Sequence, residues 1–229
     1  MRRNKIVIAP LIFVLAAAFM PSCVSTNGAN FDGAEPVSEA VSDSQSTSKT
    51  LTAQERAALA FYVYADFKSP LNHYYPSGWM GDTRDLSLDQ MSKEYPYAGK
   101  NCIKIRYTPR GKGGWAGVFW QQPSNNWGDK DGGYNLSKAT HITFWMRGES
   151  GGEVVSEVKL GGFKGDFPDS GFAVKKNMTL TTEWKLYHLS LKGKKLSRIA
   201  GGFSFTVNKD ANPNGCTFYI DEIRYEMEK

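Results

Sequence analysis

Alternation of apolar and polar residues is the dominant pattern from about residue 61 to the end of the chain. In the segment 101–107, Ile103, Ile105 and Tyr107 alternate with Cys102, Lys104 and Arg106. A period of two places successive side chains on opposite faces of a β-strand. The same period recurs in further segments, separated by clusters of Gly, Pro, Asn and Asp: 61–67, 141–147, 154–160, 184–191, 203–207 and 216–225. We find no βαβ rhythm, heptad or repeat, so the pattern predicts an all-β domain of about eight short strands, a β-sandwich or jelly roll.

One short helix is predicted just before the first strand. Thr52-Ala-Gln-Glu55 matches a capping box and is followed by Ala57, Ala58, Leu59 and Ala60. In such a box the Thr and Glu side chains satisfy backbone N–H groups at the start of a helix. We therefore place the folded domain at residues 52–229.

The first 22 residues have the pattern of a secretory signal peptide. Arg2, Arg3 and Lys5 precede the apolar run 6–20, which is followed by Pro21, Ser22 and Cys23. The run is shorter than the ~20 residues that a membrane-spanning helix needs. The end of the segment resembles a bacterial lipobox with Cys23 as the lipidated residue, although Met20 and Pro21 depart from the usual pattern. Lipidation is favoured over cleavage by the ordinary signal peptidase, which remains the alternative.

Residues 23–51 are predicted to be a disordered, lipid-anchored linker. The segment consists mainly of Ser, Thr, Ala, Asn, Asp, Glu and Gly, with Phe31 its only aromatic residue. This composition buries too little apolar surface to offset the entropy of ordering. Val24 rather than Asp follows the cysteine, so resemblance to enterobacterial sorting rules favours the outer membrane within the cell envelope.

The charge of the chain argues against a nucleic-acid partner. The formal net charge is +5, and loss of Arg2, Arg3 and Lys5 with the signal would leave +2. A small basic cluster at residues 192–195 is typical of a solvated turn. An exported protein also rarely meets nucleic acid, so we expect none as a partner.

Four of the six tryptophans lie between residues 113 and 152, among Gly, Asn and Gln: Trp115, Trp120, Trp127 and Trp145. Their flat apolar faces beside amide groups suit the CH faces and hydroxyls of a sugar. They equally suit the interior of a β-sandwich, where Trp contributes the largest apolar area. Both interpretations stay open from the residues alone.

Motifs for catalysis are absent from the sequence. It contains no G-x-S-x-G, H-E-x-x-H, P-loop or C-x-x-C motif. The histidines are scattered, and no pair of carboxylates stands out for glycosidase chemistry. Cys102 and Cys216 permit a disulfide in an oxidising compartment, but they fall on different sides of their strands, so the bond stays undecided.

The domain resembles the galactose-binding-like jelly rolls that make up several families of carbohydrate-binding modules. The resemblance rests on FYVYADF near the start, YPYAGKNCIKIRY and HITFWMRGESGG in the middle, and CTFYIDEIRYE near the end. It implies a structural Ca²⁺ held by Asp66 and Asp221, with backbone carbonyls near Lys100 completing an oxygen shell. Tyr97 departs from the pattern, because some relatives carry an acidic ligand near that position.

The resemblance also implies a glycan site on a concave sheet face or at loop tips. Trp145 and Arg147 would reach a concave face if Ile142, Phe144 and Met146 point to the core. The adjoining edge would carry the other candidate ligand-binding residues: Trp115, Trp120, Gln121, Asn126, Trp127 and Tyr134. We therefore expect a non-catalytic carbohydrate-binding lipoprotein with polysaccharide as its partner. The alternative is a structural or protein-interaction lipoprotein of the same fold without a sugar site, and a small secreted enzyme is the third possibility.

Overall fold

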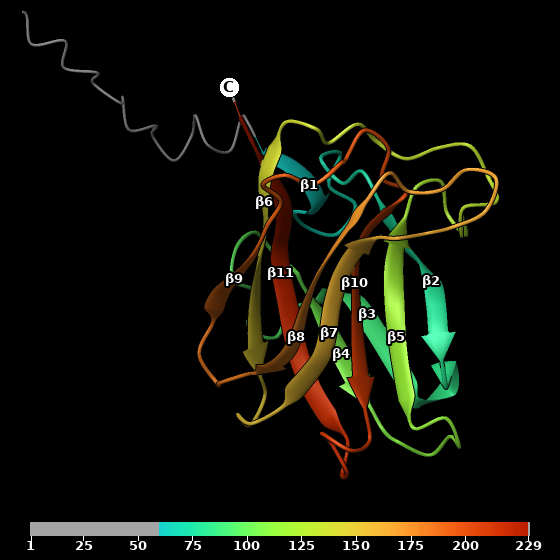
Figure 1. The fold of residues 1–229 in the computed structure, drawn as a ribbon. Helices are drawn as coiled ribbons and strands as arrows, with labels where there is room; N and C mark the ends of the chain where they lie inside the picture. Colours follow the sequence, from blue (N-terminus) through green and yellow to red (C-terminus); the bar gives the residue numbers. More distant parts are fainter. Residues whose placement is uncertain (1–59, 229) are drawn as a thin grey trace, which may run out of the picture. The chain divides into compact units, whose positions relative to one another are not determined.

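The computed structural model describes residues 60–228, which form two antiparallel β-sheets packed face to face (Figure 1). Sheet A has the order β3-β4-β11-β6-β9, with β1 paired to β11, and sheet B has the order β2-β5-β10-β7-β8. The strands of sheet A are β1 (Ala60–Tyr64), β3 (Leu86–Ser92), β4 (Cys102–Tyr107), β6 (Ala139–Gly148), β9 (Lys185–Ser190) and β11 (Cys216–Met227). Those of sheet B are β2 (Tyr75–Gly81), β5 (Trp115–Gln121), β7 (Val154–Gly161), β8 (Phe172–Thr179) and β10 (Gly201–Asn208). A single 3₁₀ turn, η1 (Thr83–Asp85), joins β2 to β3. The all-β sandwich expected from the sequence is confirmed.

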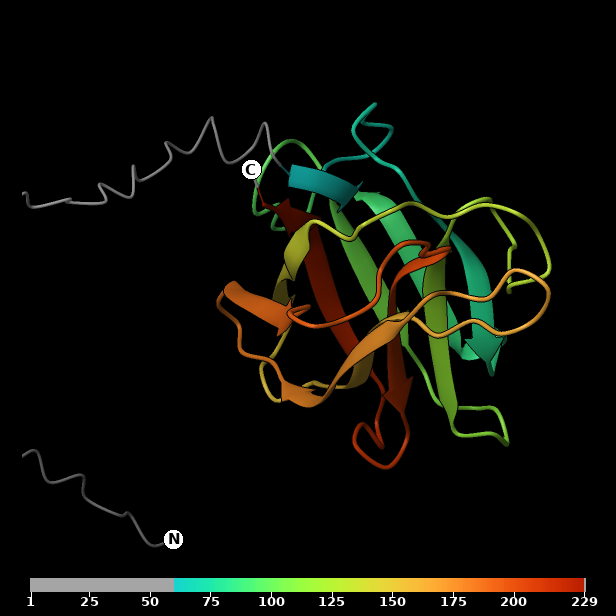
Figure 2. The same ribbon diagram turned by 45° about the horizontal axis from the view of Figure 1, so that its top comes forward.

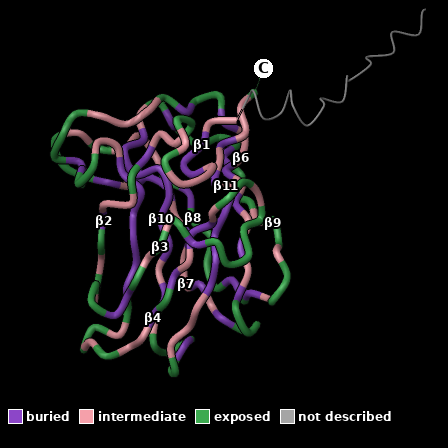
Figure 3. Tube along the Cα trace, turned by 180° about the vertical axis from the view of Figure 1, so that it is seen from behind, coloured by how far each residue is buried: buried purple, intermediate pink, exposed green. Residues whose placement is uncertain are grey.

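The core lies between the two sheets and is built by the predicted alternation. In β6, Ile142, Phe144 and Met146 are buried, and in β4, Ile103 and Ile105 are fully buried. Figure 3 shows the buried trace concentrated in the central strands, whereas the edge strands β2 and β9 are mostly intermediate or exposed. The central strands β10 and β11 receive neighbours on both sides, so their inward side chains lose nearly all contact with water.

Several edge strands were not predicted because their alternation is weak. The side chains of β8 are exposed except for those of Ala173 and Met178. The sequence of this edge strand therefore lacks the regular apolar–polar alternation from which a strand is predicted. The strand β2 contains Pro76 and Gly78, which disfavour a strand in sequence analysis but are tolerated at the edge of a sheet. The structure therefore has more strands than the pattern predicted.

Two long loops rise at one end of sheet B and position the candidate site. They span residues 122–138, between β5 and β6, and residues 162–171, between β7 and β8. Figure 1 and Figure 2 show both loops projecting beyond the ends of β2 and β5, on the same side of the sandwich.

The two cysteines of the domain do not form a disulfide. Cys216 pairs in register with Tyr107, whereas Cys102 lies at the other end of β4, and both thiols are free. The described residues begin at Ala60. They therefore do not include the predicted signal peptide 1–22, Cys23, the linker 23–51 or the helix predicted after Thr52. No helix in the part of the chain that the structure describes has the length and apolar character to span a membrane.

Candidate functional site

An aromatic cluster separate from the core lies on the outer face of sheet B. It consists of Phe119 in β5, Trp127 in the 122–138 loop and Phe163 in the 162–171 loop. The ring centroids of Phe119 and Phe163 are 4.7 Å apart, and those of Trp127 and Phe163 are 5.4 Å apart. Phe119 and Phe163 are buried, whereas the Trp127 side chain is 41% exposed. The cluster thus offers one flat, partly exposed ring on a packed aromatic base.

Buried amide groups hold Trp127 in place. The Asn126 side chain is fully buried, and its Oδ1 accepts hydrogen bonds from the backbone N–H groups of Gly128 and Lys130. Gln121 Nε2 donates to the Asn126 carbonyl at 2.9 Å, and Gln121 Oε1 accepts from the Ser77 hydroxyl at 2.8 Å. Because a buried amide is costly to leave unpaired, this network favours a single conformation of the loop around Trp127.

The two loops are joined through their backbones. The carbonyl of Gly128 accepts a hydrogen bond from Phe167 N–H at 2.8 Å. Gly128 has φ +95°, and a Cβ at this position would lie 2.1 Å from the Lys164 carbonyl oxygen, so only glycine permits this approach. The carboxylate of Asp169 accepts from Phe163 N–H and from Ala200 N–H, which ties the second loop to the start of β10. The 122–138 loop that carries Trp127 and the 162–171 loop that carries Phe163 are therefore both anchored to sheet B.

Trp115 lies at the far end of the same outer face. Its side chain is 40% exposed and packs over Gly81 of β2. Trp115, Gly117 and Phe119 form one outward row of β5, and the space beside Gly117 is filled by Met80 and Thr206 of the neighbouring strands. Strand geometry separates Trp115 from Phe119 by about 13 Å. An extended chain lying along β5 would therefore meet an aromatic residue at each end of the row.

The structure corrects the expected roles of three residues in this region. Trp120 points into the core, is fully buried, and packs against Phe203 and Phe205, so its ring is not available to a ligand. Gln121 and Asn126 are fully buried as well, and their amide groups are used by the network around Trp127. Their role is to position the loop.

Tyr134 belongs to a different aromatic group. Its ring lies edge-on to Phe61, His73 and Tyr74 at centroid distances of 5.0 to 5.5 Å. The structure therefore does not bring Tyr134 into the cluster around Trp127.

Trp145 and Arg147 face outward as expected, but on the opposite sheet. Both lie in β6 of sheet A, whereas Trp115 and Phe119 lie in β5 of sheet B. Tyr97 stacks on Trp145 at a centroid distance of 3.8 Å, and Tyr95 lies 3.9 Å from the Arg147 guanidinium. The expectation of one site spanning residues 115–147 is therefore wrong in its geometry, because the sandwich separates the two groups.

Asp66 and Asp221 together clasp the segment 97–100. Asp221 Oδ2 accepts hydrogen bonds from the backbone N–H groups of Tyr97 and Ala98, and Asp66 Oδ2 accepts from Lys100 N–H at 2.9 Å. Burial raises the pKa of Asp221 to about 7, against the opposing effect of these hydrogen bonds.

This arrangement does not fit a calcium shell, because the segment turns N–H donors rather than carbonyl oxygens toward the carboxylates. Among residues 60–228, no three His, Cys, Asp or Glu side chains are grouped so that they could hold a metal ion. Calcium binding itself stays a prediction.

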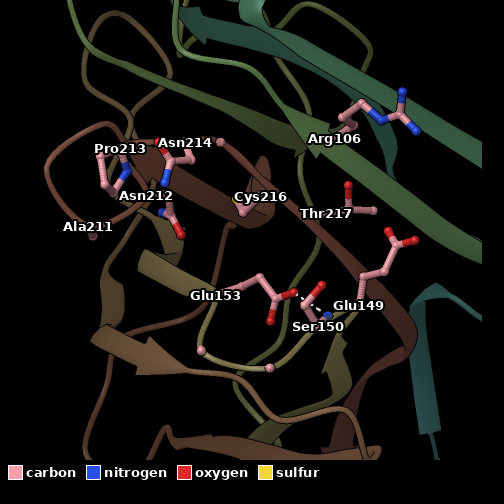
Figure 4. A pocket seen from close by; sticks show the side chains of 13 residues that line it. Arg106, Glu149, Ser150, Glu153, Ala211, Asn212, Pro213, Asn214, Cys216 and Thr217 are labelled. Carbon is pink, nitrogen blue, oxygen red and sulfur yellow. Dashed lines mark hydrogen bonds between the residues drawn. The ribbon is translucent and has the colours of Figure 1, made fainter. Parts of the chain in front are cut away.

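A hollow of about 500 Å³ lies between the turn 149–153 and the segment 211–217, away from the aromatic cluster (Figure 4). Its lining is mainly polar, and Glu153 Oε1 accepts a hydrogen bond from Ser150 N–H. The hollow also contains Cys216, whose pKa burial raises to about 12. Burial likewise raises the pKa of the Cys102 thiol to about 12. Both thiols are protonated at neutral pH, so neither is an activated nucleophile.

Sequence analysis missed Phe119 and Phe163, which form the base under Trp127. Phe119 could have been found, because it lies four residues after Trp115 in the segment WAGVFWQ. In a strand, this spacing puts both side chains on the same face. No local pattern distinguishes Phe163 in its Gly-rich loop.

Comparisons with known proteins identify the fold. No family model matches the sequence, and no curated protein is significantly similar to it. The structure is similar to a crystal structure of a family 30 carbohydrate-binding module, with a TM-score of 0.51, 16% sequence identity and coverage of 76% of this chain and 90% of that chain. A second family 30 structure has a TM-score of 0.50 and 17% identity, covering 74% of this chain and 99% of that chain. The described domain therefore has the β-sandwich fold of these modules.

Proposed function

We propose that this protein is a non-catalytic, lipid-anchored protein of the bacterial envelope that binds a polysaccharide through the outer face of sheet B. The site is centred on Trp127 and extends along β5 toward Trp115. Solved proteins with this fold are described as carbohydrate-binding modules, which supports the class of ligand. The signal pattern and Cys23 in the sequence support the anchor.

The exposed ring of Trp127 on its packed base is the observation that carries the proposal. An exposed Trp in a free loop would lose conformational entropy when a ligand ordered it. Here the loop is already held by buried hydrogen bonds, so less free energy is lost on binding. The CH face of a sugar would replace water on the indole ring, while neighbouring polar groups exchange hydrogen bonds with its hydroxyls.

The buried state of the reactive groups supports a non-catalytic role. Both thiols have a raised pKa, and the Asp221 carboxyl is fully buried and accepts hydrogen bonds from backbone N–H groups. None of these groups lies beside Trp127, where a bound sugar would be positioned.

The direct test is affinity electrophoresis of the purified protein against a panel of soluble polysaccharides, followed by calorimetry on those that retard it. Retardation that weakens in Trp127→Ala, with the variant still folded by circular dichroism, is the expected result. A parent protein that migrates freely through every polysaccharide would contradict the proposal.

A second candidate function is protein–protein interaction through sheet A. Tyr95, Tyr97 and Leu186 are 51%, 42% and 52% exposed. Tyr97 stacks on Trp145, Leu186 of β9 pairs with Trp145, and Tyr95 lies over the neighbouring Arg147. Tyrosine-rich exposed surfaces are common at protein interfaces. This alternative predicts that Tyr97→Ser weakens association with an envelope partner and leaves polysaccharide retardation unchanged.

A further inference from the structure

Basic residues are concentrated beside the aromatic cluster. The whole chain has 28 Lys and Arg against 23 Asp and Glu. The segment 159–198 alone contains eight lysines and Arg198 against three acidic residues: Asp166, Asp169 and Glu183. This segment comprises the end of β7, the 162–171 loop, β8, β9 and the turn after β9, and Lys159 and Lys164 lie nearest to Phe163 of the cluster.

A hollow of about 520 Å³ lies within this basic region. Its lining includes Lys159, Phe163, Lys164, Asp169 and Phe172. Phe163 is also part of the base under Trp127, so the hollow adjoins the proposed polysaccharide site. A chain passing over Trp127 would therefore meet this hollow next.

Phe172 is an exposed aromatic ring between two cations. Its side chain is 53% exposed, and Lys159 Nζ and Lys194 Nζ each lie 5.9 Å from its ring centroid. The ring provides an apolar face at the rim of the hollow, and the two ammonium groups provide hydrogen-bond donors beside it.

These lysines lack carboxylate partners. The ion pairs within residues 60–228 involve other cations, among them Lys176, which pairs with Glu157, and Arg198, which lies 3.9 Å from Asp131. No carboxylate lies within 4 Å of Lys159, Lys164 or Lys194 in the described domain.

The acidic residue in the lining does not neutralise the hollow. Asp169 is engaged through both oxygens by the backbone N–H groups of Phe163 and Ala200. Burial raises the pKa of this carboxyl. The lining holds two lysines, Lys159 and Lys164, against the single carboxyl of Asp169, so an excess of positive charge remains.

We propose that the hollow between Phe163 and Phe172 binds an anionic sugar unit, carboxylated or sulfated, of an acidic polysaccharide whose neighbouring unit stacks on Trp127. This inference rests on the proposed function and names its ligand class. Lys159 and Lys164, which line the hollow, donate charge-assisted hydrogen bonds to the anionic group, and Phe172 contacts the CH face of the same unit. Because Lys159 is half-buried and Lys164 is exposed, both ammonium groups reach solvent, and their contribution decreases with added salt.

The test compares affinities of the full protein for polygalacturonate, a sulfated dextran and a neutral mixed-linked β-glucan at low and high salt. The double variant Lys159→Gln/Lys164→Gln should bind an anionic polymer about five- to tenfold more weakly at low salt, as expected for two solvent-accessible ion pairs, with no change for the neutral polymer. Phe172→Ala should weaken the same binding. The control variant Lys68→Gln/Lys112→Gln removes the same charge from exposed positions outside the hollow and should bind like the parent.

Each outcome separates this inference from the proposed function. Binding of the neutral glucan through Trp127, without preference for either anionic polymer, overturns the inference and leaves the proposed function intact. Absence of binding to all three polymers overturns both. Equal losses in the two double variants, or equally tight binding to a DNA duplex, would mean unspecific attraction to polyanions and would overturn the anionic site. Preference for one of the two anionic polymers identifies whether carboxylate or sulfate is recognised.

Discussion

Replacing Trp127 by alanine removes the exposed face of the aromatic cluster and should weaken polysaccharide binding. The side chain is 41% exposed. A Trp side chain of about 250 Å² then has about 100 Å² open to water. Covering all of this area would contribute about 2.5 kcal/mol at about 25 cal/mol per Å², and covering one face about half of that. We therefore expect an affinity loss between about tenfold and about seventyfold.

The measurement is isothermal titration calorimetry with the polysaccharide that retards the parent most strongly. Trp79→Ala is the matched control, because Trp79 is 39% exposed but pairs with Val118, whose side chain faces the core. This control also removes an indole side chain from sheet B, but from the face that Val118 shares and not from the outer face that carries Phe119. Thermal unfolding of both variants checks that the fold is retained.

The result that would refute the reasoning is an equal loss in the two variants, or unchanged affinity in a folded Trp127→Ala protein. An equal loss would mean that tryptophan removal acts through the fold and not through the ligand. Unchanged affinity would place binding away from the aromatic cluster.

Four further predictions concern the loop around Trp127, the two carboxylates that hold the segment 97–100, and the lipid anchor. Asn126→Ala should lower the free energy of unfolding by about 1–3 kcal/mol, because it leaves buried backbone groups unpaired. Urea titrations measure this change, and an unchanged midpoint would contradict the role given to this amide. Asp221 has a folded-state pKa of about 7 and an unfolded value of about 3.9, so the folded state binds more protons between these values. Its contribution to stability should therefore be present at acidic pH and be lost as the pH rises from about 4 to about 7, a slope in melting temperature that Asp221→Asn removes. Bound Ca²⁺ would favour the ionised carboxylate instead, so a parent that melts lower with chelator, while Asp221→Ala does not, would support the calcium prediction. Cys23→Ala should move the protein out of the detergent phase in phase partitioning, and equal partitioning of variant and parent would exclude the lipid anchor.

The sequence was sufficient for the fold class because alternation reports burial directly. The spacing of Ile142, Phe144 and Met146 puts them on one face of their strand, and all three are in the core. Edge strands such as β8 were missed because one face and one edge meet water, which removes the apolar signal.

The candidate site could be predicted only in part, since alternation separates inward from outward but does not assign a strand to a sheet. Trp145 and Trp115 both face outward, yet they lie on opposite sheets. Trp120 was expected to line the ligand site for a related reason. Its inward direction follows from alternation within β5, and the segment 115–121 was not predicted as a strand. Trp127 lies in a loop without apolar–polar alternation, so its side chain was expected to be exposed. The ring is partly exposed. The contacts beneath it join two loops that are distant in sequence, and local patterns carry no information about such contacts.

The glycine-mediated contact between the two loops has a consequence for protein engineering. The Gly128 carbonyl and Phe167 N–H join the loops at a distance that leaves no room for a side chain at Gly128. Neither loop is then an independent unit for transplantation or randomisation. A library that diversifies residues 125–130 alone would mostly yield proteins in which the other loop has lost its support. Exchange of both loops together, with Gly128 and Asp169 retained, is the smallest graft that we expect to preserve the platform.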